Sequence, residues 1–145
     1  MDLVAHFQEA RNLVFVQAGV PLFSEGEPGK VMYVLMQGSA VVVVAGHAIE
    51  VAGPGAVLGE MALLDSSVRS ATAIARTNCR FLPINRAHFD LLVRESPEFA
   101  RHVMMVMAGR LRSMNQRLLA AVYNDPTIRD ILRRNTAAAV EQLSN

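Results

Sequence analysis

The sequence predicts a mainly β domain with flanking helices, built as a double-stranded β-helix, or jelly-roll-like β roll. Between residues 13 and 85, short β-branched or apolar runs alternate with clusters rich in glycine, proline, serine and aspartate, a pattern of many short strands. On either side of this region the apolar residues recur at helical spacing instead. Because 145 residues are the length of one ordinary domain, we expect a single domain over residues 1–145.

The expected strands of the roll are the runs 14–16, 31–36, 40–45, 48–51, 70–74 and 79–84. Turn signals such as Gly53-Pro54-Gly55 separate them. Glycine allows positive φ in such turns, and proline presets the backbone.

Helices are expected at both ends of the roll. Leu3, Val4, Phe7 and Ala10 share one face, which predicts an amphipathic N-terminal helix over 1–12. After the roll, two helices fill residues 86–123, the second starting with a proline in its first turn. A last helix over 127–143 would take Thr127 as its cap.

The long helix carries two apolar stripes. One, suited to packing on the roll, holds Phe99, Val103 and Val106. The other has the spacing of a heptad seam and consists of Met104, Met107, Leu111, Met114, Leu118 and Ala121. A second use for this seam is therefore expected, with burial in the core as the alternative.

Composition and charge exclude several classes of protein. No apolar run is long enough to cross a bilayer, and the first residues do not read as a secretory signal, so a cytoplasmic location is expected. Cys79 is the only cysteine, which removes intramolecular disulfides, cysteine-rich zinc sites and iron-sulfur clusters. The net charge is +1, divided into −3 over residues 1–100 and +4 over residues 101–145. The basic tail is interpreted as solvated helix faces, with an acidic partner surface as the alternative.

The stretch 55–72 contains the candidate site. Glycine at 59 permits close approach of a ligand, and the start of a helix at Glu60 offers backbone N–H groups to an anion. The guanidinium of Arg69 can donate two parallel hydrogen bonds to a phosphate. Glu60 would repel that anion unless it accepts a hydrogen bond, so it is interpreted as a ligand for a sugar hydroxyl. The alternative is a Glu60–Arg69 salt bridge without a ligand.

Metal and enzyme chemistry are not expected. The four histidines, His6, His47, His88 and His102, are scattered without the spacing of metal ligands. No nucleophile elbow, paired carboxylates or Ser-His-Asp order can be argued either. We therefore expect a protein without catalytic residues, metal or cofactor.

The segment GAVLGEMALLDSSVRSAT resembles the phosphate-binding cassette of the cyclic nucleotide-binding domain family, of the catabolite activator protein and protein kinase A regulatory subunit type. The resemblance extends to Leu22-Phe23, Glu25-Gly26, Pro28-Gly29 and Met32-Tyr33-Val34, over about residues 13–122. It implies a cyclic AMP ligand, with cyclic GMP left open because Ser70 keeps a hydroxyl at a position associated with guanine recognition.

The family also implies roles for single residues. Backbone N–H groups of Gly59 and Ala71 and the side chain of Arg69 would bind the phosphate, Glu60 the ribose 2′-hydroxyl, and Ser70 the phosphate or the base. Met114 and Asn115, on the long helix, would reach the base. The full set of candidate ligand-binding residues is Leu58, Gly59, Glu60, Met61, Ala62, Arg69, Ser70, Ala71, Met114 and Asn115.

In the family, the long helix either pairs with its twin or closes over the nucleotide, so a homodimer through residues 98–123 and transmission of occupancy through the C-terminal helices are expected. Residues 124–145 are too short for a helix-turn-helix domain, which predicts no direct DNA binding. A free-standing module with an unknown downstream protein partner is expected, with a regulatory domain separated from its effector as the alternative. The alternative function is a dimerisation or docking module that binds no nucleotide, or a different small effector.

Overall fold

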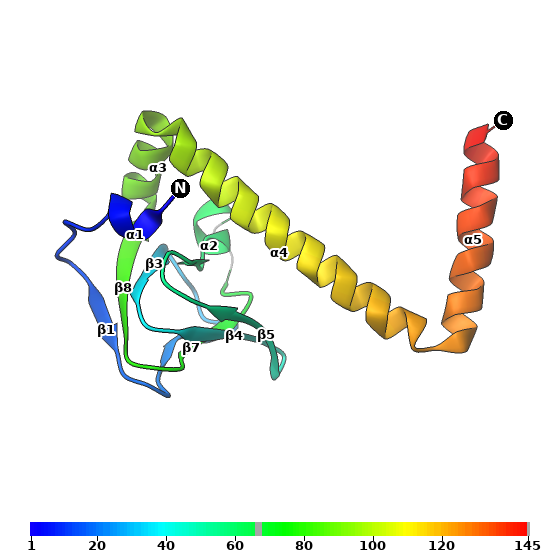
Figure 1. Cartoon of the computed structure of the whole chain (residues 1–145), viewed down its shortest axis with the longest axis horizontal. Coiled ribbons are helices and arrows are strands. Elements are labelled where there is room, and N and C mark those ends of the chain that lie inside the picture. Colours follow the sequence, from blue (N-terminus) through cyan, green and yellow to red (C-terminus); the bar gives the residue numbers. More distant parts are fainter. Residues whose placement is uncertain (66–67, 145) are drawn as a thin grey trace. The chain divides into compact units, whose positions relative to one another are not determined.

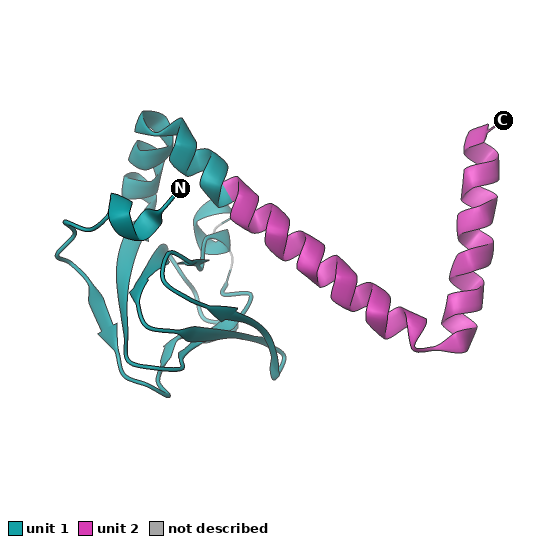
Figure 2. Ribbon diagram, in the orientation of Figure 1, with its two compact units in different colours: residues 1–103 teal, residues 104–145 magenta. Residues whose placement is uncertain are grey.

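The computed structural model describes residues 1–65 and 68–144 and groups the chain into two compact units, residues 1–103 and 104–145 (Figure 2). The sequence predicts one domain over 1–145, whereas the boundary between these units falls inside helix α4, Pro97–Tyr123. Each unit is described by itself.

The first unit is a β roll of two four-stranded antiparallel sheets, as far as the described residues go (Figure 1). One sheet has the order β1-β8-β3-β6 and the other β2-β7-β4-β5. The strands are β1 Val14–Val16, β2 Pro21–Phe23, β3 Val31–Gln37, β4 Ala40–Val44, β5 His47–Ala52, β6 Val57–Leu58, β7 Thr72–Ala75 and β8 Cys79–Asn85. The predicted fold class is confirmed.

The sequence missed the two strands β2 and β6. β6 has only two residues, and β2 begins with a proline, which is disfavoured inside strands, so neither shows a strand pattern of its own. Their partners define them instead, because Leu58 pairs with Tyr33 and Pro21 pairs with Ile74.

The N-terminal helix α1, Leu3–His6, is shorter than the predicted range 1–12. The Asp2 carboxylate caps it by accepting from the N–H of Ala5 at 3.1 Å. The chain then leaves the helix through turns and enters β1, where Val14 pairs with Phe81. The Ala10 N–H donates to the Phe7 carbonyl at 2.9 Å, three residues back, so a turn replaces the expected continuation of the helix.

The core of the first unit joins the roll to the helices that follow it. Phe81, from β8, and Phe99, from α4, are both fully buried. The Phe99 ring meets Phe7 and Phe89 edge to face, at centroid distances of 6.3 and 6.0 Å. Phe89 belongs to α3, Arg86–Glu95, so α1, α3 and the start of α4 share one aromatic cluster.

The second unit consists of the rest of α4 and helix α5, Pro126–Ser144. The Asp125 carboxylate accepts from the N–H groups of Thr127 and Ile128, at 2.9 and 3.2 Å. Asp125 is therefore the cap, and the prediction of Thr127 was wrong. Proline at 126 occupies the first helical position, where a backbone N–H would have no helical partner. The helix therefore starts one residue earlier than predicted.

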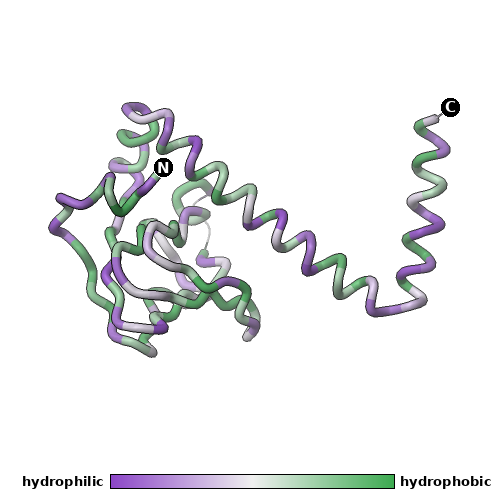
Figure 3. Tube along the Cα trace, in the orientation of Figure 1, coloured by the Kyte–Doolittle hydropathy of each residue, from purple (hydrophilic) through white to green (hydrophobic). Residues whose placement is uncertain are grey.

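The described residues of the second unit include none that is buried. Of the predicted seam, Leu111 and Leu118 are each 64% exposed and Met104 is 61% exposed. Apolar residues recur along both helices (Figure 3). In this part of the chain, a hollow of about 540 Å³ is lined by Tyr123, Leu132, Arg133, Thr136, Ala137, Val140 and Glu141.

None of the helices, as far as they are described, has both the length and the apolar character that crossing a bilayer requires.

Candidate functional site

The backbone at Arg69 is fixed by the turn that precedes β3. The Arg69 N–H donates to the carbonyl of Glu27 at 2.7 Å, and the Arg69 carbonyl accepts from the N–H of Gly26 at 2.9 Å. These two hydrogen bonds join the segment before β7 to residues 26–27. It also determines where the arginine side chain enters the molecule.

The Arg69 guanidinium is buried and held by backbone carbonyls. Its Nη1 donates to the carbonyl of Gly59 at 3.2 Å and its Nη2 to that of Val31 at 2.7 Å. The side chain as a whole is only 6% exposed. Burial lowers the pKa of Arg69, while Tyr33 and Glu27 act in the opposite direction. Because an arginine begins so far above neutrality, the group stays a cation at physiological pH.

Two glycines make room for this guanidinium. Gly59 has a φ of +77°, which a side chain would strain, and a Cβ built there would overlap Arg69 and lie 3.3 Å from Phe23. A Cβ at Gly29 would overlap the same guanidinium. The glycine expected to admit a ligand thus also admits the arginine.

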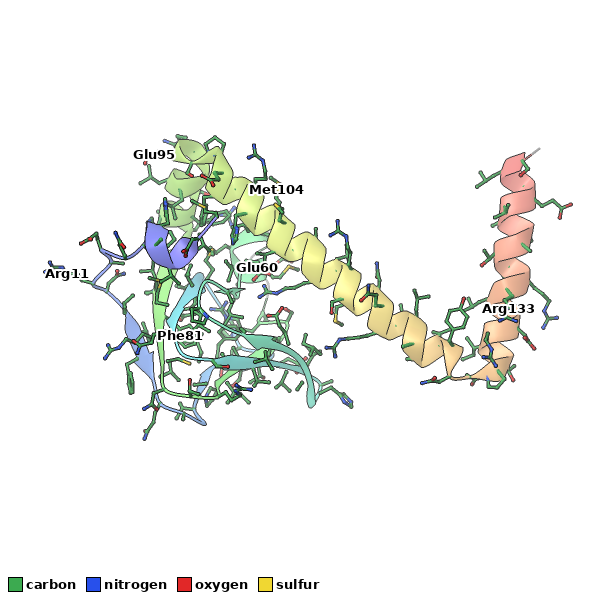
Figure 4. The ribbon with its side chains drawn as sticks, viewed as in Figure 1. Arg11, Glu60, Phe81, Glu95, Met104 and Arg133 are labelled. Carbon is green, nitrogen blue, oxygen red and sulfur yellow. The ribbon has the colours of Figure 1, made fainter. Side chains whose placement is uncertain are left out.

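Glu60 follows Gly59 directly and is 5% exposed. It occupies the N-cap position of helix α2, Met61–Leu64, but its side chain does not cap that helix. Figure 4 labels it at the start of α2. Among the described residues, Glu60 and Arg69 are the two buried polar or charged ones, and both adjoin Gly59. The two predicted ligands therefore lie on the same side of the molecule, next to one glycine.

The other cassette residues differ in exposure. Leu58 and Ala62 are buried, and Leu58 belongs to the core cluster of the roll. Met61 is 42% exposed, Ser70 is exposed and Ala71 is half-buried. The serines at 66 and 67, which the sequence favours as turn residues, lie outside the described residues.

Thr72 enters the sheet, as the sequence favours, as the first residue of β7. Its Oγ1 also accepts from the N–H of Glu25 at 2.9 Å. This bond attaches the end of the cassette to the turn that follows β2.

Met114 and Asn115, the predicted base contacts, lie on α4 in the second unit. Both are exposed there. Their role stays a prediction.

Sequence reasoning missed three features that surround Arg69. These are the ring of Phe23, the carbonyl of Val31 and the room that the absent side chain of Gly29 leaves for the guanidinium. The Cζ of Arg69 lies 4.3 Å from the centroid of the Phe23 ring. Phe23 and Gly29 both fall within the region of resemblance, so they carried a signal, although no role was assigned to them. A carbonyl is present at every residue and gives no signal in a sequence.

This arrangement supplies one cation and one carboxylate in a buried setting, which suits a ligand that is both anionic and rich in hydroxyl groups. Over residues 1–65 and 68–144, no three His, Cys, Asp or Glu side chains gather in a way that could hold a metal ion.

Three comparisons with known proteins agree on one family. A family model described as the cyclic nucleotide-binding domain matches residues 13–96. A cyclic nucleotide-gated potassium channel from Mesorhizobium japonicum is 42% identical over 85 residues, covering 59% of this chain and 23% of the channel. The cyclic AMP receptor protein of Thermus thermophilus is 31% identical over 105 residues, covering 69% of this chain and 49% of that protein.

Among solved structures, the Thermus thermophilus catabolite activator protein superposes with a TM-score of 0.69 at 28% identity, covering 83% of this chain and 57% of that one. The chain spans half or less of the length of the curated relatives named above.

Proposed function

The chain belongs to the cyclic nucleotide-binding domain family, and we propose that it binds cyclic AMP at the cassette 55–72 as a non-catalytic regulatory module. The observation that carries this proposal is the burial of Glu60 and Arg69 beside Gly59. A buried cation beside a buried carboxylate suits a ligand that carries both an anionic group and hydroxyl groups. A cyclic phosphate joined to a ribose carries both.

In this proposal, each cassette residue has one task. Arg69 pairs with the phosphate, and the backbone N–H groups of Gly59 and Ala71 bind it as well. Glu60 accepts from the ribose 2′-hydroxyl. Leu58, Met61 and Ala62 complete the cassette, while Ser70, which is exposed, meets the phosphate or the base.

The choice of base depends on Ser70 and on Met114 and Asn115. An Asn115 side chain can accept from the amino group of adenine, which favours cyclic AMP. A hydroxyl at Ser70 keeps cyclic GMP as the competing ligand.

The direct test is titration with a fluorescent cyclic AMP analogue, followed by competition with cyclic AMP and cyclic GMP. Arg69→Leu should weaken cyclic AMP binding by about 2–5 kcal/mol, since it leaves the phosphate charge unpaired in a desolvated site. The matched control is Arg80→Leu, because Arg80 is an exposed arginine of the same unit, near Phe15. Wild-type affinity in Arg69→Leu would refute the site.

The sugar contact has its own test. Glu60→Gln should weaken binding of cyclic AMP and reduce the discrimination against its 2′-deoxy analogue, because an amide oxygen is a weaker acceptor than a carboxylate. Unchanged discrimination would remove Glu60 from the sugar role.

We further propose that occupancy is transmitted through the C-terminal helices as a population shift. A ligand shifts an equilibrium only if it binds one state better than the other. Hydrogen exchange of α4 and α5 with and without cyclic AMP measures such a shift, and identical exchange in both conditions would contradict it. A cytoplasmic location and the absence of direct DNA binding remain expectations from the sequence.

A second candidate function is a dimerisation or docking module. The exposed seam residues of α4, such as Leu111 and Leu118, support a homodimer through residues 98–123. Sedimentation analysis of the wild type and of Leu111→Glu/Leu118→Glu tests it. Dimers that persist in the double variant would exclude this seam, and a dimer that binds no nucleotide would favour the second function over the first.

A further inference from the structure

The Arg69 guanidinium carbon lies over an aromatic pair. Its Cζ is 4.3 Å from the centroid of Phe23 and 5.9 Å from that of Tyr33. The two rings are stacked on each other, with centroids 6.2 Å apart and planes at 25°. Tyr33 in turn meets the buried Phe81 edge to face at 6.1 Å. The rings that touch Arg69 are thereby connected to the core of the roll.

We infer that Phe23 is a positioning residue for anion binding, because its ring fixes the plane of the Arg69 guanidinium before any ligand arrives. The inference rests on the proposed function for the identity of the anion, a cyclic nucleotide phosphate. Phe23 is itself 9% exposed and belongs to the core cluster of the roll. Because the ring is packed in the core, it stays in place and restricts the movement of the Arg69 guanidinium.

The hydrogen bonds define the orientation within that plane. The carbonyls of Gly59 and Val31 accept from two different terminal nitrogens of Arg69. A guanidinium carries five N–H donors, so these two bonds do not exhaust its capacity. The Phe23 ring thus restrains the face of the guanidinium, and the two carbonyls restrain its edges.

Preorganisation of this kind favours binding. An unrestrained arginine loses much rotamer freedom when it pairs with a ligand, and a guanidinium already ordered in the free protein loses less. The aromatic face also attracts the cation, and this attraction is stronger in a desolvated site than at the surface. The role of Phe23 is therefore exerted through Arg69 and needs no contact with the ligand.

The chain offers a matched control. Arg80 lies over the ring of Phe15 at 5.7 Å, but Phe15 is 56% exposed. Phe15→Leu removes a second ring of the same kind, stacked on an arginine outside the cassette. It should leave nucleotide affinity and the signals of Arg69 unchanged.

The first arm of the experiment measures affinity for cyclic AMP. Phe23→Leu should weaken binding about 3- to 30-fold, the range of a partly desolvated cation–π contact. Because leucine also changes packing, a second series replaces Phe23 by phenylalanines with one, three and five ring fluorines. Fluorine withdraws charge from the ring face with little change of shape, so affinity should fall stepwise along the series. Equal affinity across this series would overturn the inference, since a merely structural ring would tolerate it.

The second arm uses ligand-free protein and NMR of the Arg69 Nε–Hε group, assigned by its disappearance in Arg69→Lys. An N–H held over a ring is shifted upfield, and in Phe23→Leu it should move to the position of an unstacked arginine. An unmoved signal would overturn the inference whatever the affinity does. A wild type that binds no cyclic nucleotide would refute the proposed function, while this arm would still decide whether Phe23 holds Arg69.

Discussion

The two units of this chain treat their apolar residues in opposite ways. In the first unit, side chains such as Phe81, Leu35 and Val34 are fully buried between the sheets and helices. In the second, no described residue is buried, although methionine and leucine recur along α4 and isoleucine and leucine along α5. A roll closes over its own core, whereas a pair of helices has few neighbours to cover its apolar stripes. The first unit thus carries a buried core of its own, whereas the described apolar side chains of the second unit lie exposed or half-buried.

The largest expected effect comes from removing a core ring. Phe81→Ala should lower the free energy of unfolding by about 3–5 kcal/mol, because it deletes a buried ring and leaves a cavity. Leu118→Ala, in the second unit, should change it by less than about 0.5 kcal/mol, because that side chain is 64% exposed. Urea unfolding of dilute protein measures both. Similar losses for the two variants would erase the distinction between the units.

Two glycines should respond with opposite signs. Gly59→Ala should destabilise the first unit by about 1–3 kcal/mol, because it strains a positive φ and displaces Arg69. Gly109→Ala should stabilise α4 by about 0.5–1 kcal/mol, since it lies inside a helix and its added Cβ meets nothing within 4 Å. Thermal unfolding compares them, and a neutral Gly59→Ala would contradict the close approach of Arg69.

A helix cap gives a local effect of intermediate size. Asp125→Ala removes two hydrogen bonds at the start of α5 and should cost about 0.5–2 kcal/mol there. Hydrogen exchange should show faster exchange in α5 with unchanged amides in the first unit. The counterpart is Asn85→Ala, which removes the bond from the His88 N–H at the start of α3 and should change protection only in the first unit. Loss of protection in both units from either variant would show that they unfold together.

The smallest expected effect is a pH dependence at His102, in the first unit. Burial lowers the pKa of His102 from its ordinary 6.5, the positive N-terminus adds to this, and Glu98 opposes it. The folded state therefore favours the neutral ring. Its contribution to stability is complete above pH 6.5 and declines as the pH falls below that value. His102→Gln should flatten the change in unfolding free energy between about pH 7.5 and pH 5.5. An unchanged slope would assign the dependence to other groups.

Some elements of the fold could be predicted from the sequence and others could not. Strands β3, β4, β5 and β8 follow from their own apolar runs, and the heptad spacing on α4 was visible in the residues themselves. Strands β2 and β6 were not, because the proline of β2 and the two-residue length of β6 leave no strand pattern, and their partners define them instead. The helix expected over 1–12 ends at His6, because a turn closed by the Ala10 N–H and the Phe7 carbonyl replaces its continuation.

The sequence alone determined the fold class and the family, and it predicts the pair Glu60 and Arg69 as ligands, because strand periodicity, turn residues and a cassette of fixed spacing are local properties. Only the tertiary structure decided how Arg69 is held: by the Gly59 and Val31 carbonyls and the Phe23 ring. These partners lie 10, 38 and 46 residues away along the chain. Contacts of that range, two of them through backbone atoms that every residue has, leave no local pattern to read.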